Sequence, residues 1–479
     1  MRAIRAGDNR FTFRFSGKEM HTKGVLKEFE RILGKENVFS EETDLHAYSY
    51  DAAVLEPVTP ALVLRPVTCE ALGEAVRVCG ENRLPLTVRG AGTNLSGGVL
   101  PKKGGVVILT NALNEIVEIN EQDLYAVVQP GVVTAKFASL VESKGLFYPP
   151  DPGSQAVSTL GGNVAENAGG LRGLRYGVTR DYVMGLEFFD AGGALVKTGA
   201  RTVKCVTGYN LGGLLVGSEG TLGVFSRITL KLIPMPAAKK AMMAVFSDIR
   251  QASETVSAII ADKIVPVTLE FMDNFTIRAV EDFSGAGLPV DAAALLLIEV
   301  DGHPAQVEEE AARVEQICRK MGVMRIQAAR DAAERDKVWE ARRAALSALS
   351  RVRPTTVLED ATVPRSNIPA MVAAIGEIGK KYDLLIGTFG HAGDGNLHPT
   401  ILSDRRDAQA WSRVEKAIDA IFEKALELGG TLSGEHGIGA AKSKYLENEI
   451  GRPSILYSRR IKAALDPENI LNPGKIIGG

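Results

Sequence analysis

The stretch PPDPGSQAVSTLGGNVAENAGGLRGLRYGVTR, residues 149–180, places seven glycines among small and amide side chains. It has few branched side chains to bury, so much of its backbone N–H is available to a ligand. Clustered N–H groups suit an anion, because each directs a partial positive charge toward it. The side-chain amides of Asn163 and Asn167 add donors and acceptors for the edge of a flat ring. We therefore predict a cradle for a large phosphate-bearing cofactor, with a flexible glycine-rich linker as the alternative.

Two other glycine-rich loops belong with this cradle. Residues 89–98, RGAGTNLSGG, follow an apolar strand and approach the dinucleotide fingerprint G-x-G-x-x-G, but Leu95 stands at the third glycine. A Rossmann fold is therefore disfavoured. The loop N–H groups still suit a pyrophosphate, with Arg89 as a counter-charge. The third loop, GSEGTLGV, covers residues 217–224 and precedes another strand.

The composition excludes several classes of protein. The 56 Lys and Arg nearly balance the 58 Asp and Glu, so no global charge favours nucleic acid or an anionic membrane as partner. No apolar run approaches the roughly 20 residues of a membrane span. We therefore expect a cytoplasmic protein without a transmembrane segment. The four cysteines lie far apart without a C-x-x-C pair, which argues against an iron–sulfur cluster and favours buried thiols: Cys69, Cys79, Cys205 and Cys318.

The order of apolar segments predicts several domains, as the length of 479 residues also does. Residues 1–24 are basic, and we expect a disordered tail there. Short strands and amphipathic helices then continue to about residue 236. Residues 240–272 and 293–328 each have a strand–helix–strand pattern, typical of a split antiparallel α/β layer. A predicted helix over residues 332–350 carries the basic run that includes Arg342.

Three of the six histidines stand in glycine-flanked motifs near the C-terminus. His391 and His398 lie in GHAGDGNLH, where the glycines favour a strand and a tight turn over a helix. Glu435 and His436 lie in SGEHGIG. Two histidines and a carboxylate are a common ligand set for a divalent metal with an open position, although a lone histidine is more often a structural hydrogen-bonding group.

Adjacent residues of an extended segment point opposite ways, so Glu435 and His436 should not both face one metal unless a turn intervenes. This favours His391, His398 and Glu435 as metal ligands and His436 as a general base, since a nearby cation keeps an imidazole neutral. Asp394 is the rival ligand. The alternative is a structural role, in which the Asp394 carboxylate accepts hydrogen bonds from the backbone of its own turn.

These loops and motifs, with the ending LDPENILNPGKI, resemble the FAD-linked dehydrogenases of the vanillyl-alcohol oxidase and p-cresol methylhydroxylase fold. The resemblance runs from about residue 37 to the C-terminus and is closest to the glycolate oxidase D subunit, D-lactate dehydrogenase and D-2-hydroxyglutarate dehydrogenase. It implies an α+β fold, with an FAD-binding domain of two subdomains over residues 25–236. It further implies a ferredoxin-like α+β substrate cap over residues 237–430 and a C-terminal segment, residues 431–479, that returns to the flavin.

The resemblance also implies roles for individual residues. It makes His391, His398 and Glu435 ligands of a divalent metal, zinc or manganese, and His436 the base. Arg342 matches an arginine that binds the substrate carboxylate, a sensible use of a bidentate guanidinium, with a solvated helix face as the alternative. Together, the loops and the resemblance predict these FAD contacts: Arg89, Gly90, Ala91, Gly92, Thr93, Asn94, Pro150, Gly153, Ser154, Thr159, Gly161, Gly162, Asn163, Asn167, Gly170, Tyr176, Gly177, Gly220, Val224 and Asn472.

The sequence departs from its relatives at two informative positions. Some relatives attach FAD through a histidine just after R-G-x-G, and here that position is Thr93, so we expect non-covalent FAD. A lysine expected two residues before Asp360 in the hydroxyglutarate enzymes is Leu358. The second carboxylate of a hydroxyglutarate would lack this partner. A small D-2-hydroxy acid such as D-lactate or glycolate is therefore the favoured substrate, oxidised to the 2-oxo acid.

Other functions stay open at this point. They are a D-2-hydroxyglutarate dehydrogenase, a flavin subunit that only relays electrons, a carbon-joining flavin synthase and an oxidase that uses oxygen. The expected electron acceptor is a quinone, a cytochrome, an iron–sulfur subunit or an electron-transfer flavoprotein. We further expect a homodimer or a subunit of a complex, which a partner could hold at the inner membrane.

Overall fold

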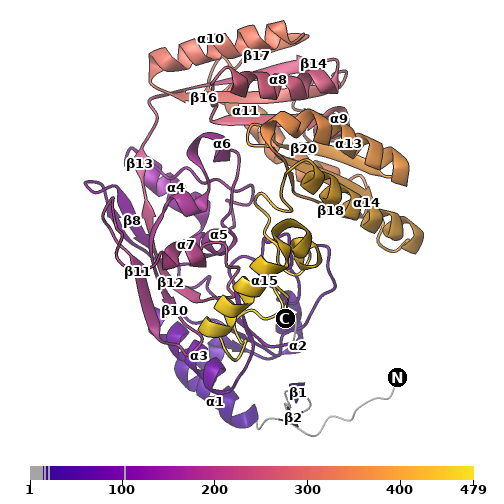
Figure 1. The fold of residues 1–479 in the computed structure, drawn as a ribbon. Coiled ribbons are helices and arrows are strands. Elements are labelled where there is room, and N and C mark those ends of the chain that lie inside the picture. Colours follow the sequence, from indigo (N-terminus) through magenta and orange to yellow (C-terminus); the bar gives the residue numbers. More distant parts are fainter. Residues whose placement is uncertain (1–13, 16–17, 20–21, 102–103, 479) are drawn as a thin grey trace.

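The computed structural model describes residues 14–15, 18–19, 22–101 and 104–478. Two sheets form the lower part of the molecule in Figure 1, and an eight-stranded sheet with its helices forms the upper part. Most of the predicted basic tail lies outside the described residues. Its described pieces, β1 (Arg14–Phe15) and β2 (Lys18–Glu19), pair antiparallel.

The first sheet has the strand order β3-β4-β6-β5. Strands β4, β6 and β5 run parallel, and β3 is antiparallel at the edge. All residues of β4 and β6 are buried, as expected for parallel strands covered on both faces. Thr68 begins α3 as the sequence predicts, since its side chain accepts a hydrogen bond from the Ala71 N–H. The elements are α1 (Thr22–Leu33), β3 (Val38–Phe39), α2 (Glu42–Ala47), β4 (Leu62–Leu64), α3 (Cys69–Glu81), β5 (Leu86–Arg89) and β6 (Val106–Leu109).

The second sheet is antiparallel, in the order β11-β10-β12-β8-β7. Its β10–β11 hairpin turns at Gly193, whose positive φ of 81° suits the glycine predicted there. The strands β9 (Leu146–Phe147) and β13 (Ile233–Pro234) pair beside it. The remaining elements are β7 (Ile116–Asn120), β8 (Tyr125–Val128), α4 (Thr134–Glu142), α5 (Leu160–Glu166), α6 (Gly173–Tyr176), β10 (Val183–Phe189), β11 (Leu195–Gly199), α7 (Leu211–Leu215) and β12 (Val224–Lys231).

The glycine-rich stretch 149–180 is more ordered than a loop. It contains the two short helices α5 and α6, and Thr159 begins α5 by accepting a hydrogen bond from Gly162 N at 3.3 Å. Gly161 is needed for close packing, because an added Cβ would lie 2.5 Å from Pro130 Cβ. The glycines of this stretch therefore allow close backbone approach inside a folded element as well as ligand access.

The upper sheet begins with the strand order β17-β14-β16-β15. This antiparallel order, with α8 and α10 as the two crossover helices, is the ferredoxin-like layer implied by the resemblance. Strand β15 also pairs with β20, which extends the sheet through β21 and β18, and β19 pairs with β21. The strands are β14 (Ala238–Phe246), β15 (Thr268–Asp273), β16 (Ala294–Gly302), β17 (Arg325–Ala328), β18 (Thr355–Leu358), β19 (Ala361–Thr362), β20 (Leu385–His391) and β21 (Asn396–Ser403).

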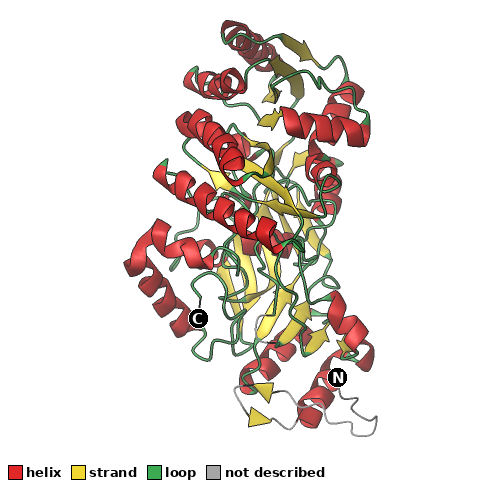
Figure 2. Cartoon of the chain, turned by 90° about the vertical axis from the view of Figure 1, so that its right-hand side faces the viewer, coloured by secondary structure: helices red, strands yellow, loops and turns green. Residues whose placement is uncertain are grey.

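Helices cover both faces of this sheet (Figure 2), and the side chains of β16 alternate between them. Leu296 and Ile298 belong to the apolar cluster that includes α8, α10, α13 and α14, whereas Leu295 and Leu297 belong to the cluster that includes α9, α11 and α12. The helix predicted over 332–350 is divided into α11 and α12, because Ala344 (φ −75°, ψ −9°) forms a turn. The helices are α8 (Ile249–Ala261), α9 (Asn274–Ser284), α10 (Pro304–Lys320), α11 (Ala332–Arg343), α12 (Ala345–Leu349), α13 (Ile368–Tyr382) and α14 (Ala408–Glu427).

The C-terminal segment returns to the first sheet after α15 (Leu446–Leu465), which is kinked at Gly451. Leu86 N donates to Ile470 O at 2.8 Å, and Asn472 N donates to Leu86 O at 2.7 Å. Asp466 holds this return, since its carboxylate accepts the N–H groups of Ile470 and Leu471 and pairs with Lys462. Residues nearly 400 positions apart in sequence thereby share one sheet edge.

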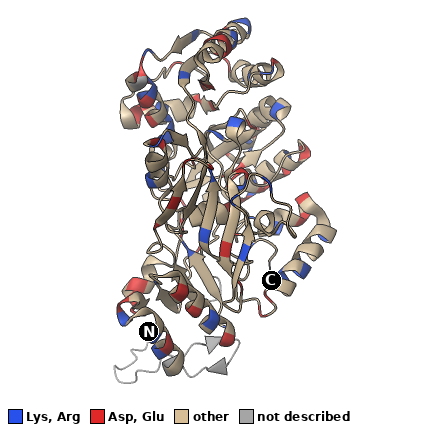
Figure 3. Ribbon diagram, turned by 90° about the vertical axis from the view of Figure 1, so that its left-hand side faces the viewer, with Lys and Arg blue, Asp and Glu red and all other residues tan. Residues whose placement is uncertain are grey.

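In agreement with the balanced composition, Lys and Arg are interspersed with Asp and Glu along the ribbon in Figure 3. None of the described helices combines the length and the apolar character needed to cross a bilayer. The prediction of buried thiols holds for Cys79 and Cys318 only: Cys69 is half-buried, and Cys205 is exposed on a loop outside the core.

Removing the Asp466 carboxylate should loosen the C-terminal return. We expect Asp466→Ala to lower the free energy of unfolding by about 3–5 kcal/mol, because Lys462 would keep only carbonyl acceptors and lose its charged partner in a mostly buried position. Chemical unfolding of both proteins measures the difference. Glu468→Ala is the matched control, since Glu468 pairs with Arg83 on the surface and should cost less than about 1 kcal/mol. Equal effects of the two substitutions would contradict this role of Asp466.

Candidate active site

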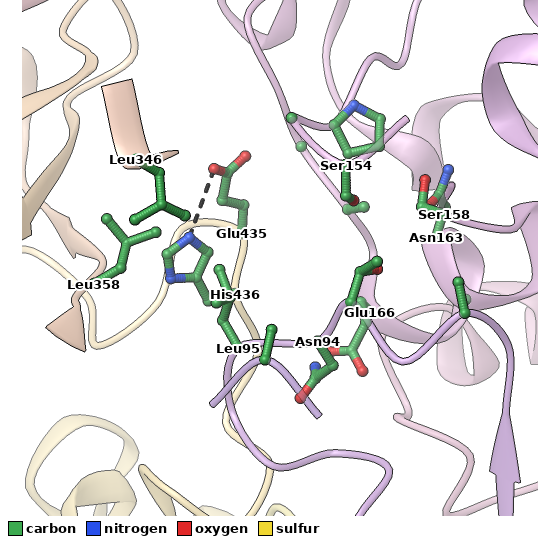
Figure 4. Close-up of a pocket in the computed structure, with 18 of the residues that line it drawn as sticks. Asn94, Leu95, Ser154, Ser158, Asn163, Glu166, Leu346, Leu358, Glu435 and His436 are labelled. Carbon is green, nitrogen blue, oxygen red and sulfur yellow. Dashed lines mark ion pairs between the residues drawn. The ribbon is translucent and has the colours of Figure 1, made fainter. Parts of the chain in front are cut away.

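A cavity of about 450 Å³ lies between the glycine-rich loops and the upper sheet. Figure 4 shows its two walls: Asn94, Ser154, Ser158, Asn163 and Glu166 on one side, and Leu346, Leu358, Glu435 and His436 on the other. One wall therefore offers backbone and small polar groups. The other offers a carboxylate, imidazoles and apolar side chains.

The cradle wall contains ten of the predicted FAD contacts: Gly90, Ala91, Gly92, Thr93, Asn94, Gly153, Ser154, Thr159, Gly162 and Asn163. Asn94 shapes the first loop, since its Oδ1 accepts the N–H groups of Ser96 and Gly98. A second cavity of about 60 Å³ shares Gly90 and Gly162 with the first. Gly161 and Gly220 also line this second cavity.

The other predicted FAD contacts are not among the residues that line either cavity: Arg89, Pro150, Asn167, Gly170, Tyr176, Gly177, Val224 and Asn472. Several make structural contacts instead. The Tyr176 hydroxyl donates to Asp301 Oδ2 at 2.7 Å, and the Asn472 side-chain amide donates to the carbonyls of Gly98 and Glu219. Arg89 donates to Tyr50 O at 2.7 Å. In the structure these side chains hold the walls of the cradle in place.

The predicted metal ligands come together at the cap wall. Glu435 Oε1 lies 3.4 Å from His391 Nε2 and 3.2 Å from His398 Nε2. Ligand atoms bound at about 2.0–2.2 Å to one cation are separated by about 2.8–3.6 Å at the usual coordination angles. The three side chains therefore fit a divalent metal. His391 and His398 stand on the β20–β21 hairpin, and in its turn Asp394 Oδ1 accepts the Asn396 N–H, as its structural explanation predicts.

His436 lies on the same side of the cavity as the three possible ligands. Its ring stacks on that of His398, with centroids 5.1 Å apart and an angle of 8° between the planes. Its Nε2 is 3.9 Å from Glu435 Oε1 (Figure 4). Asp360 holds this turn, because its Oδ2 accepts hydrogen bonds from Ser433 Oγ, Glu435 N and His436 N. Both Glu435 and His436 thus face the cavity, since the segment is a turn and not a strand.

Arg342 is buried at the end of α11 and pairs with a carboxylate that the sequence analysis did not identify. Its Nε lies 2.8 Å and its Nη2 2.5 Å from Glu270 Oε2. The guanidinium carbon lies 4.7 Å from the ring centroid of Phe389. The other oxygen of Glu270 is 2.7 Å from His391 Nδ1. The one sign of Glu270 in the sequence is that it is the single acid of the apolar run VTLEFM.

The charges around the cavity favour a cation at the His391–Glu435 contact. Burial alone would lower the pKa of His391, but Glu270 and Glu435 raise it well above its usual value. A bound cation would supply the same positive charge between these carboxylates. Burial lowers the pKa of His436 to about 4 despite the nearby Asp360, with His398 and Lys442 adding to the effect. The His436 imidazole is therefore neutral near pH 7.

Comparison with known proteins identifies the group to which the chain belongs. Residues 235–476 match the family model described as FAD linked oxidases, C-terminal domain, and residues 60–199 match the FAD binding domain. The chain belongs to the FAD-linked oxidase family. The second match contains the loops at 89–98 and 149–180, so the prediction that they belong to an FAD-binding domain is confirmed.

Relatives of this FAD-linked oxidase cover almost its whole length. It is 50% identical over 457 residues to the glycolate oxidase subunit GlcD of Bacillus subtilis, covering 95% of this chain and 97% of the relative. It is 33% identical over 465 residues to a D-lactate dehydrogenase of Anaerostipes hadrus, covering 95% and 97%. The structure of p-cresol methylhydroxylase superposes with a TM-score of 0.80 at 19% identity, covering 95% and 96%. The predicted family resemblance and fold are both confirmed.

The chain also buries an acid beside Asp360 that should make its stability depend on pH. Burial raises the pKa of Glu359 to about 7, opposed by Lys442 and assisted by Asp360. The folded state therefore binds the Glu359 proton more tightly than the unfolded chain does. The stability from this group is present below pH 4.5 and is lost as the pH rises through about 7.

The substitution Glu359→Gln should remove this loss. Relative to wild type, the variant should gain roughly 3 kcal/mol in free energy of unfolding between pH 4 and pH 8, since each pKa unit corresponds to about 1.4 kcal/mol. Unfolding midpoints at both pH values, at equal FAD content, measure the gain. Glu377→Gln on the exposed surface is the control and should follow wild type. Parallel pH curves for wild type and Glu359→Gln would refute the assignment.

Proposed function

We propose that this FAD-linked oxidase converts a small D-2-hydroxy acid, glycolate or D-lactate, to the 2-oxo acid. One observation carries the proposal: Arg342, His436 and the His391–His398–Glu435 cluster line the same cavity as the glycine-rich FAD loops. The names of the relatives, a glycolate oxidase subunit and a D-lactate dehydrogenase, support the same chemistry.

FAD would supply the two-electron acceptor for this reaction. Backbone N–H groups of residues 90–94 and of Gly153, Ser154 and Thr159 would hold it by hydrogen bonds, because these small residues line the cavity. Thr93 has no side-chain nitrogen, so we expect the flavin to be bound non-covalently.

The substrate carboxylate would bind Arg342. Its Nε and one terminal nitrogen are engaged by Glu270, which leaves further N–H donors of the guanidinium for the cavity. His391, His398 and Glu435 would hold a divalent metal, zinc or manganese, whose charge would favour the ionised form of the substrate hydroxyl. Neutral His436 would accept the hydroxyl proton as the C2 hydrogen leaves.

The cap wall favours a small substituent at C2 of the substrate. Leu346 and Leu358 line the cavity on the same side as His436 (Figure 4). A second carboxylate placed against these two leucines would lose its hydration. The leucines therefore favour glycolate or D-lactate over 2-hydroxyglutarate, whose second carboxylate would have to reach Arg343, the other arginine of the lining.

Reoxidation of the flavin would require a partner. The Bacillus subtilis and Escherichia coli relatives are named as subunits of glycolate oxidase, which supports assembly with other chains. We propose a protein acceptor with an iron–sulfur cluster, a cytochrome or a flavin, or else a quinone. The enzyme would then act in the cytoplasm, at the inner membrane where its acceptor is found.

Anaerobic bleaching of the flavin absorbance tests the reaction. Glycolate or D-lactate should reduce the flavin rapidly, and L-lactate and D-2-hydroxyglutarate slowly. We expect His436→Ala to slow reduction by about 10²–10⁴-fold, the usual contribution of a general base, with its FAD content unchanged. His303→Ala is the control, since His303 is exposed at the start of α10. Reduction of the His436→Ala flavin at the wild-type rate would contradict the role of His436. Reduction by none of these acids would contradict the proposed function.

Metal removal tests the ligand assignment separately. Treatment with a chelator should abolish flavin reduction while the absorbance of bound FAD stays unchanged. Zinc or manganese should restore the rate in wild type but not in His398→Ala, which loses one of three ligands. Metal content before and after treatment measures the stoichiometry. Full flavin reduction by metal-free protein would contradict the proposal that these residues bind a metal needed for the reaction.

A further inference from the structure

We propose that Glu270 is a positioning residue that fixes a metal-ligand histidine and the substrate-binding arginine at the same time. The inference rests on the proposed function for the roles of His391 and Arg342. It concerns a residue of β15 that contributes no atom to the cavity lining.

The two oxygens of Glu270 serve different partners. Oε1 lies 2.7 Å from His391 Nδ1, and Oε2 lies 2.8 Å from Arg342 Nε and 2.5 Å from Arg342 Nη2. The Glu270 side chain is 0% exposed, so these contacts are shielded from bulk solvent. A single buried carboxylate therefore joins the two groups that would bind metal and substrate.

The contact with His391 selects one tautomer of the ring. A carboxylate accepts a hydrogen bond, so Nδ1 must carry the proton. When a metal is bound, Nε2 provides the lone pair, and this nitrogen faces Glu435 at 3.4 Å. A histidine that binds a metal through Nε2 commonly donates its Nδ1 proton to a carboxylate in this way.

The contact with Arg342 fixes the direction of the guanidinium. Its Nε edge is held by Glu270, and its face lies on the ring of Phe389. The plane of the guanidinium is therefore defined from two sides. The remaining N–H groups keep one orientation toward the cavity, which a bidentate grip on a carboxylate requires.

The sheet supports this arrangement. Strand β15 pairs with β20, with Phe271 opposite Gly390, so Glu270 and His391 belong to directly paired strands. Arg342 approaches from α11, on the face of the sheet that also buries Met272. The carboxylate is thus held by backbone pairing and not by a loop, which suits a positioning role.

The substitution Glu270→Gln separates positioning from packing. Glutamine has nearly the same shape but offers one acceptor and one donor group. It cannot accept from both His391 Nδ1 and Arg342. We expect zinc and manganese to bind about 10–100-fold more weakly, the usual effect of losing such an outer contact, and KM for glycolate or D-lactate to rise.

Metal affinity is measured on FAD-loaded, metal-free protein by competition with a chromogenic chelator. The tautomer is read from ¹⁵N-histidine spectra of the zinc-loaded protein, which has only six histidines, with His391→Asn to assign the signal. Wild type should have a protonated Nδ1 and a metal-bound Nε2 at His391, and the Nδ1 signal should shift in Glu270→Gln, because the carboxylate that accepts its proton is gone. Glu270→Asp keeps two acceptor oxygens and should regain part of the affinity.

Glu299→Gln is the matched control. Glu299 is also buried, stands on neighbouring β16, and accepts from Trp339 Nε1 on the helix that carries Arg342. It touches none of the site residues, so metal affinity and the His391 signal should stay as in wild type. Wild-type affinity and an unshifted His391 signal in Glu270→Gln would overturn the inference. A wild-type protein that binds neither metal would overturn the metal assignment and this inference together.

Discussion

Buried charges can persist in this enzyme only because each faces an opposite charge, and this constraint organises the cap side of the cavity. Burial alone would raise the pKa of Glu270, but Arg342 and His391 hold this pKa below its ordinary value. The same holds for Glu435, whose pKa His391 and His398 keep well below its usual range despite burial. Because these side chains are already paired in a site shielded from water, they do not have to reorient when an anionic substrate binds.

Distant parts of the chain supply these charges, and backbone contacts bring them into register. The hairpin β20–β21 carries His391 and His398, and its pairing with β15 places Glu270 beside them. The turn with Glu435 and His436 follows α14 and is held to the cap by the Asp360 carboxylate. Each group therefore has its own rigid support, and no single loop determines the geometry of the site.

The motifs that could be predicted from sequence are local ones. Glycine-rich loops and the GHAGDGNLH and SGEHGIG segments carry their chemistry in consecutive residues, so the cradle, the histidine cluster and the family were accessible. The role of Glu270 could not be predicted from sequence. A single acid in an apolar strand has no recognisable pattern, and only the pairing of β15 with β20 brings it to His391. The expectation that Glu435 and His436 point apart assumed an extended segment. The turn held by Asp360 brings both to the cavity, which no local pattern indicates.

The stretch 149–180 has a second task beyond lining the cradle. Arg172 pairs with the buried Asp151 inside the stretch, and four residues later the Tyr176 hydroxyl donates to Asp301 on β16 of the upper sheet. Arg175 also contacts Asp301, at 3.4 Å. The segment that would hold FAD is thus bonded directly to the cap that would hold the substrate. Because hydride transfer depends on the distance between flavin and substrate, a chain segment shared by both binding sites fixes that distance more closely than two separate loops could.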